Sequence, residues 1–223
     1  RVGGHGRGRV LHAHQGDGAA VGGGDGAAGV GVIIEAKHLC NADGGTLYLT
    51  QGEELTFAMI HSDSLGLRQG GSTGNTVDLM PIPVFDPHGS ANRRNIATCA
   101  YHEKKAIHVA DAYAPSRFDL TGAHEFDQQN GYRTVSILAI PLVSVHNTVL
   151  GVLQLINARD PVTGEIGVFS PSDQRLAESL ASQAAIALTN RMLINQLEQL
   201  FESFIKLINT AIDEKSPYTG GHC

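Results

Sequence analysis

The feature that most constrains the fold of this chain is a helix-forming segment near its C-terminal end. Neither proline nor glycine occurs between Ser172 and Ser216. Ser170, Pro171 and Asp173 form a typical helix start, with a capping serine, a proline at the first helical position and an acidic residue at the third. A helix of roughly 45 residues spans about 65 Å, which is longer than a domain of about 130 residues is wide. This helix must therefore extend beyond the domain that precedes it.

The second half of this segment carries a heptad pattern. Apolar residues recur at alternating spacings of three and four, and three leucines widen the stripe. The seam consists of Ile194, Leu197, Phe201, Phe204, Ile208 and Ala211, and the leucines are Leu193, Leu200 and Leu207. Such a seam is typical of a parallel coiled coil or helical bundle. Residues 191–212 are therefore predicted to be a coiled-coil connector helix that joins two copies in a homodimer. The alternative is an amphipathic helix that packs on its own domain.

Upstream of this helix, the chain has the pattern of an antiparallel sheet covered by helices. Two hairpins with apolar strands are predicted, and the second is apolar on both faces, which places it at the sheet centre. The strands are expected at 45–50, 55–61, 134–145 and 150–158, with shorter ones at 77–80 and 106–109, and the helices at 30–40, 92–104 and 121–129. In the first helix, Ile33, Ile34, Lys37 and Leu39 are expected to form one side that packs on the sheet. Apart from its short strand, the segment 62–90 is expected to be a long loop.

Composition excludes several classes of partner. The net charge of −6 leaves no basic surface for a phosphate backbone, so no nucleic acid is expected. The longest apolar runs, such as 136–145, are too short for a membrane-spanning helix, which needs about 18 to 20 residues. Cys40, Cys99 and Cys223 lie far apart without the spacing of a disulfide frame or a metal site. No membrane is therefore expected as a partner, and the cytoplasm is the expected location.

The N-terminal segment differs from the rest in composition. Residues 1–32 contain 12 of the 27 glycines, and such a sequence buries too little apolar surface to offset the entropy of ordering its backbone. Residues 1–29 are therefore expected to be a disordered tail or a misread stretch of coding sequence. A phosphate-binding loop is the alternative, but the GxxxxGK[ST] pattern is missing.

Five sequence blocks in order resemble a GAF domain over residues 30–190. They are ADGGTLYL at 42–49, KKAIHVADAYAPSRFD at 104–119, GYRTVSILAIPL at 131–142, LGVLQLINA at 150–158, and FSPSD with LASQAAIALTN within 169–190. The blocks are similar to those of GAF domains that accompany cyclic-nucleotide and bacterial HD-type phosphodiesterases. The resemblance implies an α+β fold, an α/β sandwich with an antiparallel sheet of five or six strands and helices on both sides, followed by the long C-terminal connector helix.

A second resemblance concerns the C-terminal residues. FIKLINTAIDEKSPYTGGHC at 204–223 resembles the first helix and first motif of HD-GYP domains, so residues 213–223 are expected to be the truncated start of such a domain. The resemblance implies that His222 is a metal ligand in the intact parent, which would use divalent iron or manganese to hydrolyse cyclic di-GMP. Tyr218 stands where three-metal members have a glutamate, which favours a two-metal relative. One imidazole cannot hold a catalytic metal, so this chain by itself is expected to be inactive.

The GAF resemblance also implies a small-ligand pocket. In cyclic-nucleotide GAF domains the ligand lies between the sheet and the regions that match His61, Ile96, Ala97, Tyr113 and Thr134, and Asn157 belongs to the family's N-K-x-F-x-x-x-D-E signature. That signature is degraded here, because Ala158 follows Asn157, although Arg159 can substitute for its lysine, and Phe169 and Asp173 are retained. The expected ligand is a cyclic nucleotide or another small molecule. Backbone N–H groups at the start of the helix near Ile96 are candidates to donate hydrogen bonds to a phosphate group of the ligand.

Two other cofactor types have candidate residues in the sequence. Cys99 is a candidate for bilin attachment and His102 for haem binding, but the usual Cys-His adjacency is missing. Cys99 is therefore expected to pack in the core as a small apolar residue, and His102 and His108 are expected to be solvated.

The leading function is a regulatory module of a bacterial signalling phosphodiesterase. It would sense a small ligand, change the geometry of the connector helix and so control a downstream HD-GYP domain. The alternative is a purely structural dimerisation module that binds no ligand.

Overall fold

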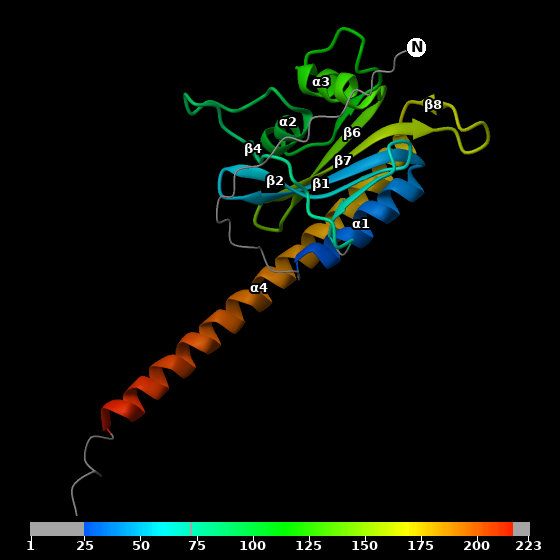
Figure 1. The fold of residues 1–223 in the computed structure, drawn as a ribbon. Helices are drawn as coiled ribbons and strands as arrows, with labels where there is room; N and C mark the ends of the chain where they lie inside the picture. The colour runs from blue at the N-terminus through cyan, green and yellow to red at the C-terminus, as the bar shows by residue number, and fades with distance from the viewer. Residues whose placement is uncertain (1–24, 72, 216–223) are drawn as a thin grey trace, which may run out of the picture.

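The structure is a computed structural model that describes residues 25–71 and 73–215 (Figure 1). In chain order its elements are α1 (Asp25–Leu39), β1 (Ala42–Gln51), β2 (Glu54–Ser62), β3 (Leu67–Gly70), β4 (Ile82–Pro83), α2 (Ile96–Glu103), β5 (Ile107–Val109), α3 (Thr121–Asn130), β6 (Ile137–Val143), β7 (Val149–Arg159), β8 (Ile166–Gly167) and α4 (Pro171–Lys215). His222, Cys223 and the rest of residues 216–223 lie outside the described residues, as do residues 1–24 and 72.

The strands form one antiparallel sheet with the order β3-β2-β1-β7-β6-β5. In addition, β4 pairs with the start of β2, and β8 pairs with the end of β7. Both predicted hairpins are present, as β1–β2 and β6–β7. Residues 137–142 of β6 are all buried, which confirms that this hairpin is covered on both faces. Gly52, with φ of 60°, permits the tight turn between β1 and β2.

The sheet lies between two layers of helices, as Figure 1 shows. On one face, Ile33 and Ala36 of α1 and Ala177 and Ala181 of α4 pack on Leu153 and other apolar strand residues. On the opposite face, a second core joins α2 and the segment around α3 to the sheet, and its members include Tyr48, Ile96, Cys99, Leu120 and Val152. The predicted sandwich with helices on both sides is thus confirmed.

The long helix α4 begins as the sequence predicts. The Ser170 backbone N–H donates to the Asp173 carboxylate at 2.7 Å, and the Asp173 N–H donates to Ser170 Oγ at 3.2 Å, which satisfies two amides at the helix start. The first part of α4 packs beside α1, and the rest extends away from the sheet (Figure 1). Within this extension Leu197 and Phe204 are 65% and 59% exposed. The heptad seam is therefore present as a solvent-facing stripe in the single chain.

Three expectations about the remaining segments were wrong. The first helix begins at Asp25, within the segment expected to be disordered, and Ile34 and Leu39 are exposed while Ile33, Ala36 and Lys37 are buried. Residues 77–80, which the structure describes, do not form the expected strand. The short strands β3, β4 and β8, in contrast, were not predicted. Strands of two to four residues depend on pairing with a neighbour, so their own sequence carries little signal.

Candidate functional site

A cavity of about 290 Å³ lies between the sheet and the layer that contains α2 and α3. Its floor is the face of β1, β2, β6 and β7 opposite to α1, and its other walls come from α2, α3 and the loops around Leu65 and Leu79. The lining residues include Tyr48, Phe57, Ile60, Ile96, Leu120, Phe126, Ile137 and Ile156. A largely apolar hollow with a few polar groups is the usual form of a small-molecule site.

The polar residues of this lining include one pair on the sheet and one pair on the opposite side. Thr46 of β1 and Gln154 of β7 are direct cross-strand partners on the cavity floor. Arg94 and Asp119 line the opposite side, where Arg94 Nε lies 3.9 Å from Asp119 Oδ2 and the two side chains are 85% and 37% exposed. The charges of the described lining thus lie toward solvent, whereas the sheet side is uncharged.

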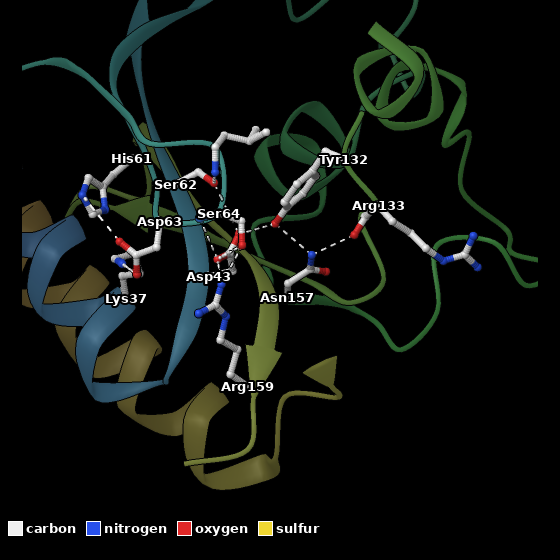
Figure 2. Close-up of polar contacts among 11 residues, drawn as sticks. Lys37, Asp43, His61, Ser62, Asp63, Ser64, Tyr132, Arg133, Asn157 and Arg159 are labelled. Atoms are coloured by element: carbon white, nitrogen blue, oxygen red, sulfur yellow. Dashed lines mark hydrogen bonds and ion pairs between the residues drawn. The ribbon is translucent and has the colours of Figure 1, made fainter. Parts of the chain in front are cut away.

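Three of the six predicted ligand-site residues line this cavity, namely His61, Ile96 and Thr134. The His61 side chain, however, lies on the other face of the sheet. His61 pairs with Gly45, whose missing Cβ would contact Ile33 of α1, and paired residues point to the same face. Figure 2 accordingly shows the His61 ring near Lys37 and Asp63. His61 therefore contributes its backbone to the cavity wall.

The His61 imidazole is buried beside an ion pair. Nε2 lies 4.0 Å from Asp63 Oδ1, and the Lys37 ammonium pairs with the same carboxylate (Figure 2). Burial, and next to it the charge of Lys37, lowers the pKa of His61, because both disfavour the protonated ring. Nδ1 is buried without a hydrogen-bond partner among the described residues.

The other three predicted site residues do not line the cavity. Ala97 is buried in the core of α2, and its backbone N–H donates to Asn95 Oδ1 at 2.8 Å. This amide is therefore already capped by a side chain and is not free to receive a phosphate. Tyr113 lies on the surface, stacks on His124 with ring centroids 4.4 Å apart, and lies under the Arg133 guanidinium.

The Asn157 side chain does not line the cavity; it holds the backbone by hydrogen bonds. It is fully buried with φ of 57°, in the left-handed region that asparagine tolerates better than most residues. Its Oδ1 accepts from the Val135 N–H at 2.7 Å, and its Nδ2 donates to the Arg133 carbonyl oxygen and to Tyr132 Oη, both at 2.8 Å (Figure 2). Asn157 thereby holds the segment that leads into β6.

A buried carboxylate, Asp43, organises the end of the sheet beside the cavity (Figure 2). It accepts hydrogen bonds from Tyr132 Oη at 2.6 Å, Ser64 Oγ at 2.8 Å, the Ser64 N–H at 3.2 Å and Ser62 Oγ at 3.3 Å, and it pairs with the Arg159 guanidinium. Burial by itself raises the pKa of Asp43, but the hydrogen bonds from Tyr132 and Ser64 and the charge of Arg159 outweigh it, so the pKa lies below its usual value.

This network supports the cavity wall. Ser62 and Leu65 lie in the segment that Asp43 holds, and both line the cavity. Thr134, on another side, donates from its N–H and Oγ1 to the Asp127 carboxylate of α3 at 2.7 and 2.8 Å. The walls are thus fixed by hydrogen bonds to two buried carboxylates.

Sequence reasoning missed Asp43 and Gln154, and it assigned Arg159 a different role. Arg159 pairs with Asp43, whereas Asp173 caps α4, so Arg159 does not restore the expected contact of the family signature. The contact with Asp43 joins residues 116 positions apart. The one available signal was an acidic residue within the otherwise apolar start of β1.

The alternative cofactor positions lie in packed surroundings. Cys99 is buried in the α2 core, as expected. His102 was expected to be solvated, but it packs edge-on against Phe85 and Tyr101, and its Nε2 is within hydrogen-bond distance of the Val84 carbonyl oxygen. Over residues 25–71 and 73–215, no group of three His, Cys, Asp or Glu side chains has metal-site geometry. The helices of this part are also too short or too polar to cross a membrane.

Comparison with known proteins gives consistent results. A family model described as GAF domain matches residues 32–188. The dual 3′,5′-cyclic-AMP and -GMP phosphodiesterase 11 of Drosophila melanogaster is 34% identical over 175 residues, which are 75% of this chain and 11% of that protein. The cGMP-specific 3′,5′-cyclic phosphodiesterase of Drosophila ananassae is 23% identical over 185 residues, 81% of this chain and 14% of that protein. The chain thus spans a small part of these relatives.

Solved structures show the same fold. A GAF domain/HD domain protein from Geobacter sulfurreducens aligns with a TM-score of 0.54 and 15% identity, over 76% of this chain and 95% of that one. The blue-light absorbing form of the PixJ GAF domain from Thermosynechococcus elongatus aligns with a TM-score of 0.52 and 16% identity, over 80% of this chain and 91% of that one.

Proposed function

This chain belongs to the GAF domain family, and we propose that it is the small-ligand-sensing and dimerising module of a signalling phosphodiesterase. The observation that carries this proposal is the 290 Å³ cavity on the sheet face opposite to α1 and α4. A ligand in the cavity contacts β1, β2 and β7, and the same strands support α1 and α4 on their other face. A change in these strands therefore reaches the connector helix directly.

The contact between Lys37 and Asp63 offers one route between the two faces. Asp63 follows β2, whose residues Ile60 and Ser62 line the cavity, and Lys37 belongs to α1, which packs beside α4. A shift of the end of β2 on ligand binding would move this ion pair and α1 with it. Such coupling needs only that the ligand favours one position of β2 over another.

Cyclic nucleotides are the first ligands to test. By their names, one Drosophila relative is a phosphodiesterase of both cyclic AMP and cyclic GMP, and the other is specific for cyclic GMP. Most of this chain aligns with each of them. The cavity suits the base of such a nucleotide, and Arg94 places a positive charge at its outer side. A different small metabolite in the same cavity is the alternative ligand.

The connector and the C-terminal residues suggest the output. The exposed stripe on α4, including Leu197, Phe201 and Phe204, would bury its apolar surface in a parallel homodimer. The HD-GYP resemblance of 204–223 suggests a downstream cyclic di-GMP phosphodiesterase domain, in which His222 would be one ligand of divalent iron or manganese. The Geobacter protein is, by its name, one in which a GAF domain and an HD domain occur together.

Thermal unfolding with added ligand tests the sensor function. A ligand that binds only the folded protein stabilises it by RT ln(1 + [L]/Kd), about 2.7 kcal/mol at 100 times Kd. We expect cAMP, cGMP or a member of a metabolite panel to raise the Tm of the wild type. Ala123→Phe should abolish this rise, because Ala123 lines the cavity and the larger ring would fill it.

Gln128→Phe is the matched control, since Gln128 is exposed on the same helix and does not line the cavity. It should respond to ligand as the wild type does. An unchanged Tm with every compound would instead favour the second function, a structural dimerisation module without a ligand.

A further inference from the structure

The exposed side of α4 changes in character where the helix leaves the domain. Beyond the domain this side is the apolar seam, which begins with Ile194 and Leu197. Beside the domain the same alternating spacing of three and four is occupied by Gln183, Ala187 and Asn190. All five residues are exposed in the single chain. The seam thus continues toward the domain, but two of its positions there carry amide side chains.

The burial pattern of α4 shows that this side faces away from the domain. Alanine and leucine residues spaced three and four apart belong to the core, namely Ala177, Ala181, Ala184 and Leu188. With roughly 3.6 residues per turn, Gln183 and Asn190 lie on the opposite side of the helix. A second copy can therefore approach this side of α4 without displacing the core.

The apolar part of the seam does not by itself determine how two helices align. From Ile194 to Ala211 every seam position carries an apolar side chain. One apolar layer can replace the next when a helix slips by a heptad, so a slipped pair buries similar side chains. A further element is needed to favour one arrangement over the others.

An amide side chain in such a seam is selective for its partner. Asparagine presents both a donor and an acceptor, so two facing asparagines can hydrogen-bond to each other. An asparagine that faces an apolar residue is buried without a partner, which is unfavourable. A polar seam residue of this kind specifies the register and the number of helices, at a cost in stability.

The neighbours of the two amides determine which arrangements are disfavoured. In a parallel pair without offset, Asn190 meets Asn190 of the second copy, and Gln183 meets Gln183. After a slip of one heptad, Asn190 of one copy faces Leu197 of the other. The Gln183 side chain of that other copy then faces Leu176 of the first. In an antiparallel pair centred on the apolar seam, Asn190 faces the far apolar end. The parallel pair without offset is thus the arrangement that pairs both amides.

We propose that Asn190, together with Gln183 one heptad before it, fixes the parallel register of the α4 dimer. This inference rests on the proposed dimerising function and identifies the residues that align the two copies. Asn190 lies two positions after Leu188, the last α4 residue of the core. The two connectors are therefore aligned at the point where they leave their domains, so equivalent positions of the two extensions face each other.

Replacement of Asn190 by leucine tests this proposal, with Asn195→Leu as the matched control. Asn195 lies on the same helix but outside the seam positions. We expect Asn190→Leu to tighten the dimer by about 10-fold or more in sedimentation equilibrium, because it exchanges a polar seam layer for an apolar one. Asn195→Leu should dimerise as the wild type does.

A spin label at an exposed position reports the register. Thr210→Cys in a Cys223→Ser protein provides the site, since Thr210 is exposed on α4 and Cys40 and Cys99 are buried. Pulsed electron paramagnetic resonance should give a single distance for the wild-type seam and for Asn195→Leu. Asn190→Leu should add longer distances, because a slip of one heptad displaces the helices by about 10 Å along their axis.

Asn190→Asp tests the contact independently of any repacking. It places two like charges opposite each other at the seam and should weaken the dimer by about 10-fold or more at pH 7. Asn195→Asp adds the same charge outside the seam and should leave the dimer unchanged. Circular dichroism verifies that each variant is folded.

The possible outcomes separate this proposal from the function on which it rests. A single unchanged distance in Asn190→Leu would overturn the proposal, because the apolar seam would then fix the register alone. Equal dimer affinities for Asn190→Asp and Asn195→Asp would also overturn it, because Asn190 would lie outside the contact, while the dimer itself stands. A wild-type protein that remains monomeric at all concentrations would instead show that the dimerising function is wrong.

Discussion

The hydroxyl group of Tyr132 donates a hydrogen bond of 2.6 Å to the Asp43 carboxylate, across 89 positions of sequence. Asp43 is fully buried at the start of β1, and Tyr132 precedes β6. Burial and the bond to Asp43 raise the pKa of Tyr132 far above its usual value, so the phenol remains a donor. The pair holds the two segments that contain Ser62 and Thr134, and both of these residues line the cavity.

Removal of this carboxylate should destabilise the domain strongly. Asp43→Ala leaves the Arg159 guanidinium, the Tyr132 hydroxyl and the Ser64 N–H without their acceptor. We expect a loss of about 3–5 kcal/mol in the free energy of unfolding, the range for breaking a buried ion pair from one side. Urea unfolding followed by circular dichroism measures it.

Two further variants calibrate this result. Tyr132→Phe removes one hydrogen bond to a charged group and should cost about 1.5–3 kcal/mol. Asp78→Asn, on an exposed loop, should change the stability by less than about 0.5 kcal/mol. An Asp43→Ala protein as stable as Asp78→Asn would show that the network does not hold the fold.

The low pKa of Asp43 predicts a specific dependence of stability on pH. A carboxyl group whose pKa is lower in the folded than in the unfolded state stabilises the fold while it is ionised in both. This contribution is complete above the unfolded-state pKa of about 3.9 and is lost as the pH falls through the lower pKa of the folded protein. The free energy of unfolding of the wild type should therefore decrease below about pH 4.

Asp43→Asn provides the comparison, because it cannot titrate at this position. The difference in unfolding free energy between wild type and Asp43→Asn should be constant from about pH 5 to 7 and become smaller toward pH 2. A difference that stays constant down to pH 2 would contradict the assigned pKa direction. The other acidic residues remain in both proteins, so their titration cancels.

The sequence predicted those parts of the fold that have local signals. Both long hairpins have apolar strands of sufficient length, and α4 has a capping serine, a proline and an aspartate at its start. The helix expected at 121–129 is α3, and Gly131, with φ of 61°, caps its end. Such signals depend on residues within a few positions of each other.

The candidate site was less predictable, because its contacts join distant segments. Arg159 was a candidate to replace the lysine that contacts Asp173 in the family signature, yet it pairs with Asp43, which belongs to the adjacent strand of the sheet. His61 was expected to face a ligand, but the register places its side chain on the α1 face. Ala58 is bulged between the partners of Leu47 and Tyr48, and a shift of one residue exchanges the two faces of a strand.

The close approach of β7 to β1 at Gly151 requires a glycine. A Cβ atom at this position would lie 2.2 Å from the Tyr48 carbonyl oxygen, so Gly151→Ala must push two central strands apart. We expect a loss of about 1–3 kcal/mol, as for other overpacked core positions. Gly167→Ala is the control, because a Cβ there would have open space, and equal Tm values for the two variants would contradict the prediction.

The thiol of Cys40 should be unreactive in the folded protein. Burial, with the nearby charge of Asp173, raises its pKa to about 11, and only the thiolate is a nucleophile. Its thiolate fraction at neutral pH should be about 300-fold lower than that of a free cysteine with a pKa of about 8.5. Burial also raises the pKa of Cys99.

Labelling with iodoacetamide tests this in a Cys223→Ser protein, since Cys223 lies outside the described residues. Modification of Cys40 and Cys99 should require unfolding, and mass spectrometry after digestion would identify each site. Rapid modification of Cys40 under native conditions would show that its surroundings open, and the Asp43→Ala protein provides a destabilised reference for such opening.

Charged residues in the exposed stripe on α4 should dissociate the proposed dimer. Leu197 and Phe204 are largely exposed in the single chain and occupy seam positions of the heptad pattern. Their joint replacement by glutamate would place like charges opposite each other in a parallel dimer. Each buried charge without a partner costs several kcal/mol, more than the remaining apolar contacts of the seam supply, so the dimer should dissociate while the domain stays folded. Sedimentation measures the dimer, and circular dichroism measures the folding of the domain.

Gln199→Glu with Ser203→Glu adds the same charge outside the seam and should leave the dimer intact. A dimer that persists in the seam variant would place the interface elsewhere, and loss of the whole fold would show that this part of α4 packs on its own domain.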